Sequence, residues 1–355
     1  MVTYNNMASQ KKVTEKKILI IGPSWVGDMM MAQSLFMLIK QHNPSVLIDV
    51  LAPSWSRSIL CRMPEVNRAI DMPIGHGSIK LADRRKLGLE LRLENYTQSI
   101  VLPNSIKSAL IPWFAKIPHR TGWKGEMRYG LLNDLRRLNK KTYPLMVERF
   151  ASLALPKNAV LPKNIPYPVL MTDNAKATQF AKQLGLTSGR KVLALCPGAE
   201  FGPSKKWPEK YYAAVAASKI ADGWQVWLLG SQKDKQVGQK INNFLPLGDR
   251  AHSHNLAGVT QLDEAIELLS IADAVVSNDS GLMHISAALG RPLVALYGST
   301  SPEFTPPLNT KAVMMSIPVD CGPCFKRECP IKNMKCLEDL LPAKVISELS
   351  QLVPN

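Results

Sequence analysis

Two series of short apolar runs, separated by a proline-rich segment, constrain the fold of this chain most strongly. The runs are four to six residues long and cover 17–21, 46–51, 69–72, 99–102, 191–195, 225–229, 274–277 and 293–297. Continuous apolar runs of this length are typical of parallel strands that are buried on both faces. Segments with helical character lie between many of them, at 28–41, 54–63, 78–93, 208–221, 262–271 and 285–289. Strands that alternate with helices predict doubly wound α/β sheets.

The proline-rich segment divides the two series. Residues 155–169 contain Pro156, Pro162, Pro166 and Pro168, so this stretch can be neither a helix nor a central strand. We therefore predict two Rossmann-like domains, at 17–165 and 166–340, that face each other across a cleft. Residues 1–16 are predicted to be a disordered tail. A last helix, within 341–355, is expected to pack back on the first domain.

Size and charge narrow the class of protein. A chain of 355 residues suits two domains, and none of its apolar runs reaches the roughly 20 residues of a membrane span. The first 17 residues are polar, so we expect a cytoplasmic protein without a secretory signal. Residues 1–170 hold 25 Lys and Arg against 11 Asp and Glu, whereas the second half is nearly balanced. The basic half is expected to meet nucleic acid, an anionic membrane surface or a polyanionic substrate.

The segment 278–284, Asn-Asp-Ser-Gly-Leu-Met-His, is the strongest indication of a site. It follows the run at 274–277 and precedes a helix. Backbone N–H groups at such a helix start attract anions, particularly a diphosphate. His284 lies about one turn into the helix and can reach the same anion. We therefore predict a nucleotide-like or phosphorylated ligand in the C-terminal half.

A glycine loop opens the first helix and carries a carboxylate. Asp28 follows Gly22 and Gly27 at the end of the first strand, without the G-x-G-x-x-G pattern of dinucleotide sites. An aspartate at a helix start is often only an N-cap. At the mouth of a cleft, the Asp28 carboxylate can also accept a proton from a substrate hydroxyl.

Two further groups of residues are candidates for anion binding. Lys205 or Lys206 can pair with a phosphate, and Ser204 can donate a hydroxyl hydrogen bond to it, although a solvated basic turn explains the same residues. Basic residues interleaved with tryptophan and tyrosine, in a stretch whose part 119–125 is expected to be a loop, suit sugars that carry carboxylates or phosphates, or single-stranded nucleic acid. A solvated surface with core tryptophans explains the same residues. These residues are Lys107, Arg120, Lys124 and Arg128.

Four cysteines lie close together near the C-terminus. Cys321, Cys324, Cys329 and Cys336 have the spacing C-x2-C-x4-C-x6-C. In a cytosolic chain this favours a structural zinc ion over disulfides, while reduced thiols and an oxidised pair both remain open.

These motifs together resemble the ADP-heptose:lipopolysaccharide heptosyltransferases, most closely the type II branch. The matching segments are 22–35, 197–200, 205–208, 278–284 and 321–324, and the resemblance runs from about residue 17 to 352. It implies a GT-B fold in which the first domain binds the acceptor and the second the nucleotide sugar. The implied reaction is inverting transfer of L-glycero-D-manno-heptose from ADP-heptose to the first heptose of the lipopolysaccharide inner core.

The resemblance also implies a role for individual residues. Asp28 matches the proposed base of the family, Lys205 its phosphate-facing lysine, and Asp279, Ser280, Gly281 and His284 its donor motif. A metal is not required for this chemistry, because helix amides, a lysine and His284 can stabilise the leaving diphosphate, although a divalent cation stays open. If His284 is protonated in the complex, it adds a charge-assisted hydrogen bond. The expected partners are ADP-heptose, the inner-core acceptor and the anionic cytoplasmic face of the inner membrane.

Other functions stay open at this point. The chain can be a GT-B transferase for another nucleotide sugar or acceptor, such as a type I heptosyltransferase, or a two-lobed nucleotide-sugar-binding protein without catalysis. A nucleic-acid binder is less well supported, because the sequence carries no helix-turn-helix or RNA-binding signature.

Overall fold

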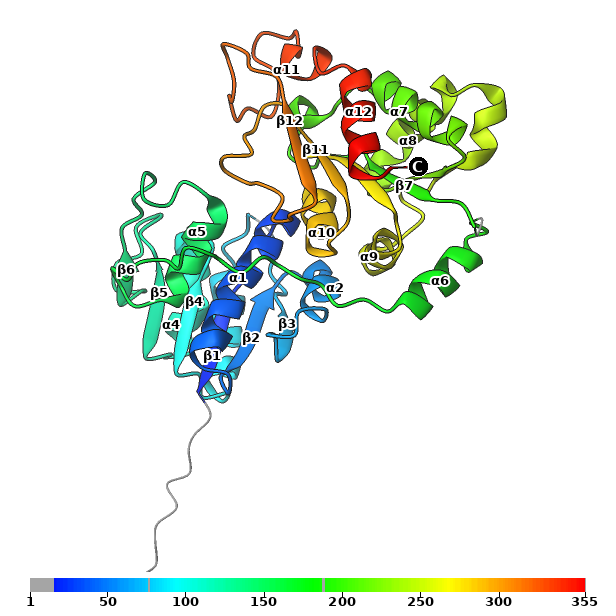
Figure 1. Cartoon of the computed structure of the whole chain (residues 1–355). Coiled ribbons are helices and arrows are strands. Elements are labelled where there is room, and N and C mark those ends of the chain that lie inside the picture. Colours follow the sequence, from blue (N-terminus) through cyan, green and yellow to red (C-terminus); the bar gives the residue numbers. More distant parts are fainter. Residues whose placement is uncertain (1–15, 76, 187–188, 355) are drawn as a thin grey trace, which may run out of the picture.

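The computed structural model describes residues 16–75, 77–186 and 189–354 and contains two parallel six-stranded sheets. The predicted tail, except for residue 16, lies outside the described residues. Strand order is β3-β2-β1-β4-β5-β6 in the first sheet and β12-β11-β10-β7-β8-β9 in the second, and neighbouring strands in both sheets are parallel. Figure 1 shows the two sheets as separate α/β domains. The prediction of two Rossmann-like domains is confirmed.

In the part of the chain that the structure describes, the N-terminal domain contains the first six strands and five α-helices. Its strands are β1 Lys17–Ile21, β2 Leu47–Ala52, β3 Arg68–Asp71, β4 Gln98–Val101, β5 His119–Trp123 and β6 Asp134–Arg136. Its helices are α1 Val26–His42, α2 Arg57–Leu60, α3 Leu81–Arg92, α4 Ile106–Phe114 and α5 Met146–Ala151, with short 3₁₀ turns at Ser54–Ser56 and Ser152–Ala154.

The C-terminal domain repeats this architecture. Its strands are β7 Val192–Cys196, β8 Gln225–Leu228, β9 Ser253–Asn255, β10 Ala274–Asn278, β11 Leu293–Tyr297 and β12 Ala312–Ser316. Its helices are α6 Asn174–Gln183, α7 Glu209–Ala221, α8 Lys235–Phe244, α9 Leu262–Ser270, α10 Gly281–Ala288, α11 Lys335–Glu338 and α12 Pro342–Leu352. Short 3₁₀ helices cover Pro203–Lys205, Gln232–Asp234 and Leu247–His252.

Burial on both faces explains why the strands are continuously apolar. In β1, Ile18 and Ile20 belong to the core cluster on the side of α1, whereas Leu19 and Ile21 belong to the cluster on the side of α3 and α4. All four side chains are buried. Successive strand residues point to opposite faces, so a sheet covered by helices on both sides needs apolar residues at every position.

The proline-rich segment passes across α1 on its way from one domain to the other (Figure 1). The Gln33 side chain donates to the carbonyl oxygen of Val169 at 2.7 Å and accepts from its amide at 3.0 Å. The hydroxyl of Ser34 donates to the carbonyl oxygen of Pro166 at 2.6 Å. An ion pair of 2.6 Å also joins Arg62 of the first domain to Glu267 of the second. The linker is therefore anchored by polar side chains rather than by regular secondary structure.

Two details of the sequence prediction were wrong. The predicted loop at 119–125 is strand β5 as far as Trp123, and it pairs with β4. The last helix, α12, packs on α7 and β11 of its own domain, not on the first domain. Val345 and Leu349 of α12 are fully buried in the C-terminal core, which gives this helix its attachment.

Candidate active site

Asp28 lies in the first turn of α1, on the edge of the N-terminal domain that meets the second domain. The helix begins at Val26, and Trp25 occupies the N-cap position, so Asp28 is not the cap. Its side chain is partly buried. The carboxylate is close enough to Lys205 and Asp279 of the other domain for both to influence its pKa. The structure therefore brings the predicted base and the predicted donor site together.

The second domain presents the start of α10 at the same place. Ser280 is the N-cap of α10, but its hydroxyl lies 3.3 Å from the hydroxyl of Ser277 and, within the described chain, makes no capping hydrogen bond. The first-turn N–H groups of the helix are therefore available to an anion, as helix starts favour. Asn278 fixes this turn, because its amide donates to the carbonyl oxygen of Pro197 at 2.6 Å and accepts from the Tyr212 hydroxyl at 3.0 Å.

A part-buried ion pair organises the donor side. The Lys205 ammonium lies 2.6 Å from Oδ2 of Asp279, and the hydroxyl of Thr300 donates to the same oxygen at 2.5 Å. Asp279 is 3% exposed. Asp279 therefore holds the Lys205 ammonium and the Thr300 hydroxyl in place, and its predicted part in binding the donor stays a prediction. Thr300 was missed by the sequence analysis, because nothing near it in the sequence marks it as a site residue.

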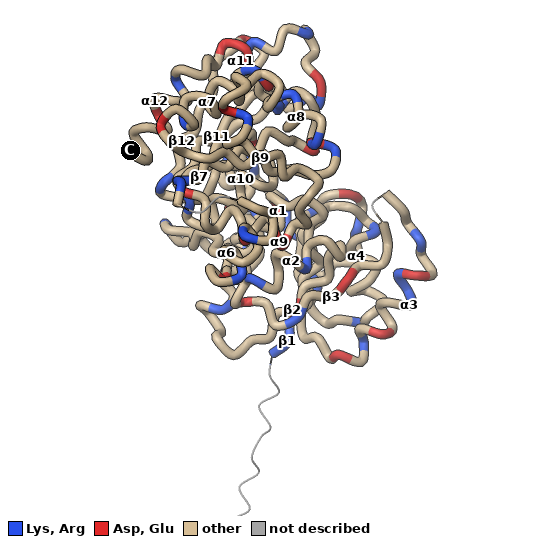
Figure 2. The backbone as a smooth tube through the Cα atoms, turned by 90° about the vertical axis from the view of Figure 1, so that its right-hand side faces the viewer, with Lys and Arg blue, Asp and Glu red and all other residues tan. Residues whose placement is uncertain are grey.

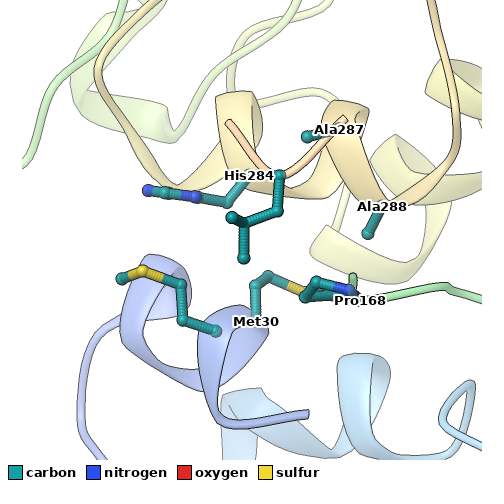
Figure 3. A pocket seen from close by; sticks show the side chains of 7 residues that line it. Met30, Pro168, His284, Ala287 and Ala288 are labelled. Atoms are coloured by element: carbon teal, nitrogen blue, oxygen red, sulfur yellow. The ribbon is translucent and has the colours of Figure 1, made fainter. Parts of the chain in front are cut away.

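The starts of α1 and α10 touch, and both contacts need glycine. A Cβ on Gly27 would lie 2.7 Å from Cδ2 of His284, and a Cβ on Gly281 would lie 2.7 Å from Cβ of Val26. Figure 3 shows the His284 ring extending from α10 above the α1 helix, beside a small crevice lined by Met30, Pro168, Ala287 and Ala288. The positive ends of two helix dipoles thus converge beside Lys205, an arrangement that attracts a diphosphate.

Burial shifts the pKa of both titratable groups at this contact. It raises the pKa of Asp28 to about 6, against a lowering by Lys205 and with a smaller increase from Asp279. Burial also lowers the pKa of His284 to about 4, although Asp279 opposes that change. The His284 ring is therefore neutral near pH 7 in the protein without a bound ligand. A neutral imidazole still offers one N–H donor to a phosphate oxygen.

Ser204 does not have the role that the sequence predicted. Its side chain is 2% exposed. The hydroxyl donates to the carbonyl oxygen of Lys326 at 2.5 Å and lies 2.9 Å from the hydroxyl of Ser299. Because these protein groups occupy the hydroxyl, Ser204 supports the loop before Lys205 instead of binding the donor.

The four predicted acceptor residues separate into two pairs. The Arg128 guanidinium is buried and donates to the carbonyl oxygens of Pro103 and Trp123. Arg120 lies near the amino end of β5, away from the carboxyl edge of the sheet, and donates to the carbonyl oxygens of Ile117 and Leu131. Both arginines are structural, which corrects their assignment as acceptor ligands.

Lys107 and Lys124 remain candidates for acceptor binding. Lys107 lies in the first turn of α4, and Lys124 directly follows the carboxyl end of β5. The exposed Lys124 ammonium lies 5.5 Å from the centre of the Tyr129 ring. Ligands of open parallel sheets bind at this edge.

The four clustered cysteines are free thiols. The pKa of the Cys336 thiol is raised by burial and by the charges of the other three cysteines, so the four side chains lie close to one another. Across residues 16–75, 77–186 and 189–354, however, the structure arranges no three His, Cys, Asp or Glu side chains to hold a metal ion. The structure thus gives no support to the zinc site, which stays a prediction from the spacing alone.

Comparison with known proteins adds to this geometry. Residues 84–335 match the model of glycosyltransferase family 9 (heptosyltransferase). Lipopolysaccharide heptosyltransferase 2 of Escherichia coli is 50% identical over 342 residues, covering 95% of this chain and 98% of the relative. This chain belongs to glycosyltransferase family 9.

Other members of the family agree in sequence and in structure. Lipooligosaccharide heptosyltransferase 2 of Haemophilus influenzae is 54% identical over 308 residues, covering 84% of this chain and 88% of the relative. The solved structure of E. coli ADP-heptose lps heptosyltransferase II superimposes with a TM-score of 0.87 at 48% identity, covering 95% of this chain and 98% of that one. The GT-B architecture expected from the sequence is confirmed.

Proposed function

We propose that this family 9 enzyme transfers L-glycero-D-manno-heptose from ADP-heptose to the first heptose of the lipopolysaccharide inner core, with inversion at the anomeric carbon. One observation carries the proposal. Where the starts of α1 and α10 meet, Asp28 of the first domain lies within electrostatic reach of Lys205 of the second, and the neighbouring Gly27 packs against the His284 ring. The relatives that cover nearly the whole chain are named for heptose transfer with ADP-heptose and lipopolysaccharide, which supports this donor and this class of acceptor.

The arrangement divides the reaction between the two domains. The acceptor hydroxyl attacks the anomeric carbon from the side of Asp28, and the Asp28 carboxylate takes the hydroxyl proton. The bond between the anomeric carbon and the β-phosphate oxygen breaks, and ADP leaves with its electron pair. Lys205, the N–H groups at the start of α10 and the neutral His284 stabilise the charge that develops on the diphosphate. One carboxylate suffices, because a single displacement needs no covalent intermediate.

The reaction itself is tested by incubating the purified protein with ADP-heptose and an inner-core acceptor that already bears one heptose. We expect mass spectrometry to detect the gain of one heptose unit on this acceptor. A matched acceptor without any heptose should gain none, which separates this function from that of a type I heptosyltransferase. Transfer to the heptose-free acceptor, or turnover with UDP- or GDP-sugars instead, would contradict the proposal.

The acidity of Asp28 predicts a pH dependence. A base must be ionised to accept a proton, so kcat/KM should fall as the pH drops through about 6, by about tenfold for each further unit. An unperturbed aspartate, with a pKa of 3.8, would leave the activity constant down to about pH 4. Transfer rates measured between pH 4.5 and 8.5 distinguish the two cases, and a flat profile would exclude Asp28 with its raised pKa as the base.

The acceptor is an anionic glycolipid, which suits the basic N-terminal half of the chain. Lys and Arg positions are frequent along α3 and around β1 to β3, interspersed with acidic ones (Figure 2). In the described residues, no helix is both long and apolar enough to cross a bilayer. We propose that the enzyme contacts the anionic cytoplasmic face of the inner membrane through this domain, held by charge.

A further inference from the structure

The loop that carries the first three of the four cysteines packs directly against the donor site. Its main chain, at Phe325, Lys326 and Arg327, bonds to two other loops. Phe325 N–H donates to the carbonyl oxygen of Ser299 at 2.8 Å, and the carbonyl oxygen of Arg327 accepts from Ser204 N–H at 3.2 Å. The three loops, which are far apart in the sequence, therefore form one hydrogen-bonded unit.

Ser204 is the centre of this unit. Besides its N–H bond to Arg327, its hydroxyl donates to the carbonyl oxygen of Lys326 and pairs with the hydroxyl of Ser299. Its own carbonyl oxygen accepts from Ser299 N–H at 3.3 Å. All the polar groups of Ser204 are thus bonded within the protein, in a position that is 2% exposed.

The residues that follow Ser204 and Ser299 both act on Asp279. Lys205 comes directly after Ser204, and Thr300 directly after Ser299, and both bind Oδ2 of Asp279. The backbone of the two loops is also in close contact, since a Cβ on Gly298 would lie 2.8 Å from the carbonyl oxygen of Ser204. A shift of the Ser204–Ser299 pair must therefore displace the Lys205 ammonium from its place beside α10.

We propose that Ser204 is a positioning residue, which sets the place of Lys205 in the donor site by joining the cysteine loop to the loop of Ser299. This inference rests on the proposed role of Lys205 in binding the diphosphate of ADP-heptose. It makes the main chain of residues 325–327 part of the support of the donor site. Ser204 itself touches neither the sugar nor the phosphates.

The test is a double-mutant cycle that pairs Ser204→Ala with Lys205→Met and is measured as ADP affinity by titration calorimetry. Loss of one buried hydroxyl that bridges two partners should weaken ADP binding of the single variant about five- to twentyfold. In the Lys205→Met background the same substitution should change ADP affinity by less than about twofold, because the group that it positions is gone. Equal effects in both backgrounds would overturn the proposal.

Controls separate positioning from general destabilisation. Ser253→Ala removes another buried hydroxyl, which donates to the Asn242 side chain at 2.7 Å in β9, and should leave ADP affinity unchanged. Ser299→Ala removes the other hydroxyl of the pair. It should weaken ADP binding when Lys205 is present and have little effect in the Lys205→Met background. The test therefore stays decisive even if Ser204→Ala does not fold. Unchanged ADP affinity in both the Ser204 and the Ser299 variant would contradict the proposal.

ADP binding also distinguishes this inference from the proposed reaction. A wild-type protein that binds ADP but transfers no heptose would refute the heptosyltransferase function, and the cycle would still decide the role of Ser204. A wild-type protein with no affinity for ADP would overturn both.

Discussion

Replacing Asp28 with asparagine should lower the rate of heptose transfer by about 10²- to 10⁴-fold, the range typical of a lost general base. Asparagine has nearly the same shape but cannot take the proton of the acceptor hydroxyl. Steady-state rates at pH 8 measure the effect. Asp83→Asn is a matched control, because Asp83 also lies in the first turn of an N-terminal-domain helix, on α3. It should transfer heptose at the wild-type rate.

The same substitution should not destabilise the protein. Because burial raises the Asp28 pKa to about 6, the folded state holds this proton more tightly than the unfolded state does. Stability is therefore lost as the pH rises from about 4 to 6, by roughly 3 kcal/mol for a shift of about two units. At pH 8 the asparagine variant should unfold at the same or a higher temperature than wild type. An inactive variant that unfolds well below wild type would point to a structural role for Asp28.

Replacing Lys205 with methionine should reduce kcat/KM for ADP-heptose by about 10²- to 10³-fold, the usual cost of losing one preorganised donor to a developing charge. Methionine keeps much of the length of the lysine side chain but lacks its ammonium group. The change also leaves the buried Asp279 carboxylate with only Thr300 as its hydrogen-bond partner among those observed, so it repels the diphosphate. Donor-dependent kinetics measure both consequences.

The neighbouring lysine provides the control for this prediction. The Lys206 ammonium lies 3.5 Å from Asp234 and forms no ion pair with Asp279 among the described residues. Lys206→Met should therefore keep kcat/KM within a fewfold of wild type. Similar losses in both variants would mean that general positive charge, not the placement of Lys205, serves the donor.

The sequence predicted the elements whose burial is continuous and missed those that depend on their neighbours. The strand at 17–21 has apolar residues at four of its five positions and matches β1. Strand β5 reads His-Arg-Thr-Gly-Trp, and only its last three residues are buried, so its composition resembles a loop. Pairing with β4 makes it a strand, which no local pattern indicates.

The site shows the same division. Asp28, Lys205 and His284 could be proposed from the sequence because each lies in a motif in which a strand gives way to a helix. The roles of Ser204 and Thr300 could not be predicted, because they depend on three loops that meet only in the folded chain. Arg128 was misassigned because a positive charge among aromatic residues suits an anion. In the structure its guanidinium donates hydrogen bonds to main-chain carbonyl oxygens instead.

The central claim is that the two domains have separate parts in the reaction. The N-terminal domain supplies the base, and the C-terminal domain binds the diphosphate. Titration calorimetry with ADP on wild type, Asp28→Asn and Lys205→Met tests it most directly. The account predicts nearly wild-type ADP affinity for Asp28→Asn and a clear loss for Lys205→Met. Loss of ADP binding in Asp28→Asn, or full binding in Lys205→Met, would contradict it.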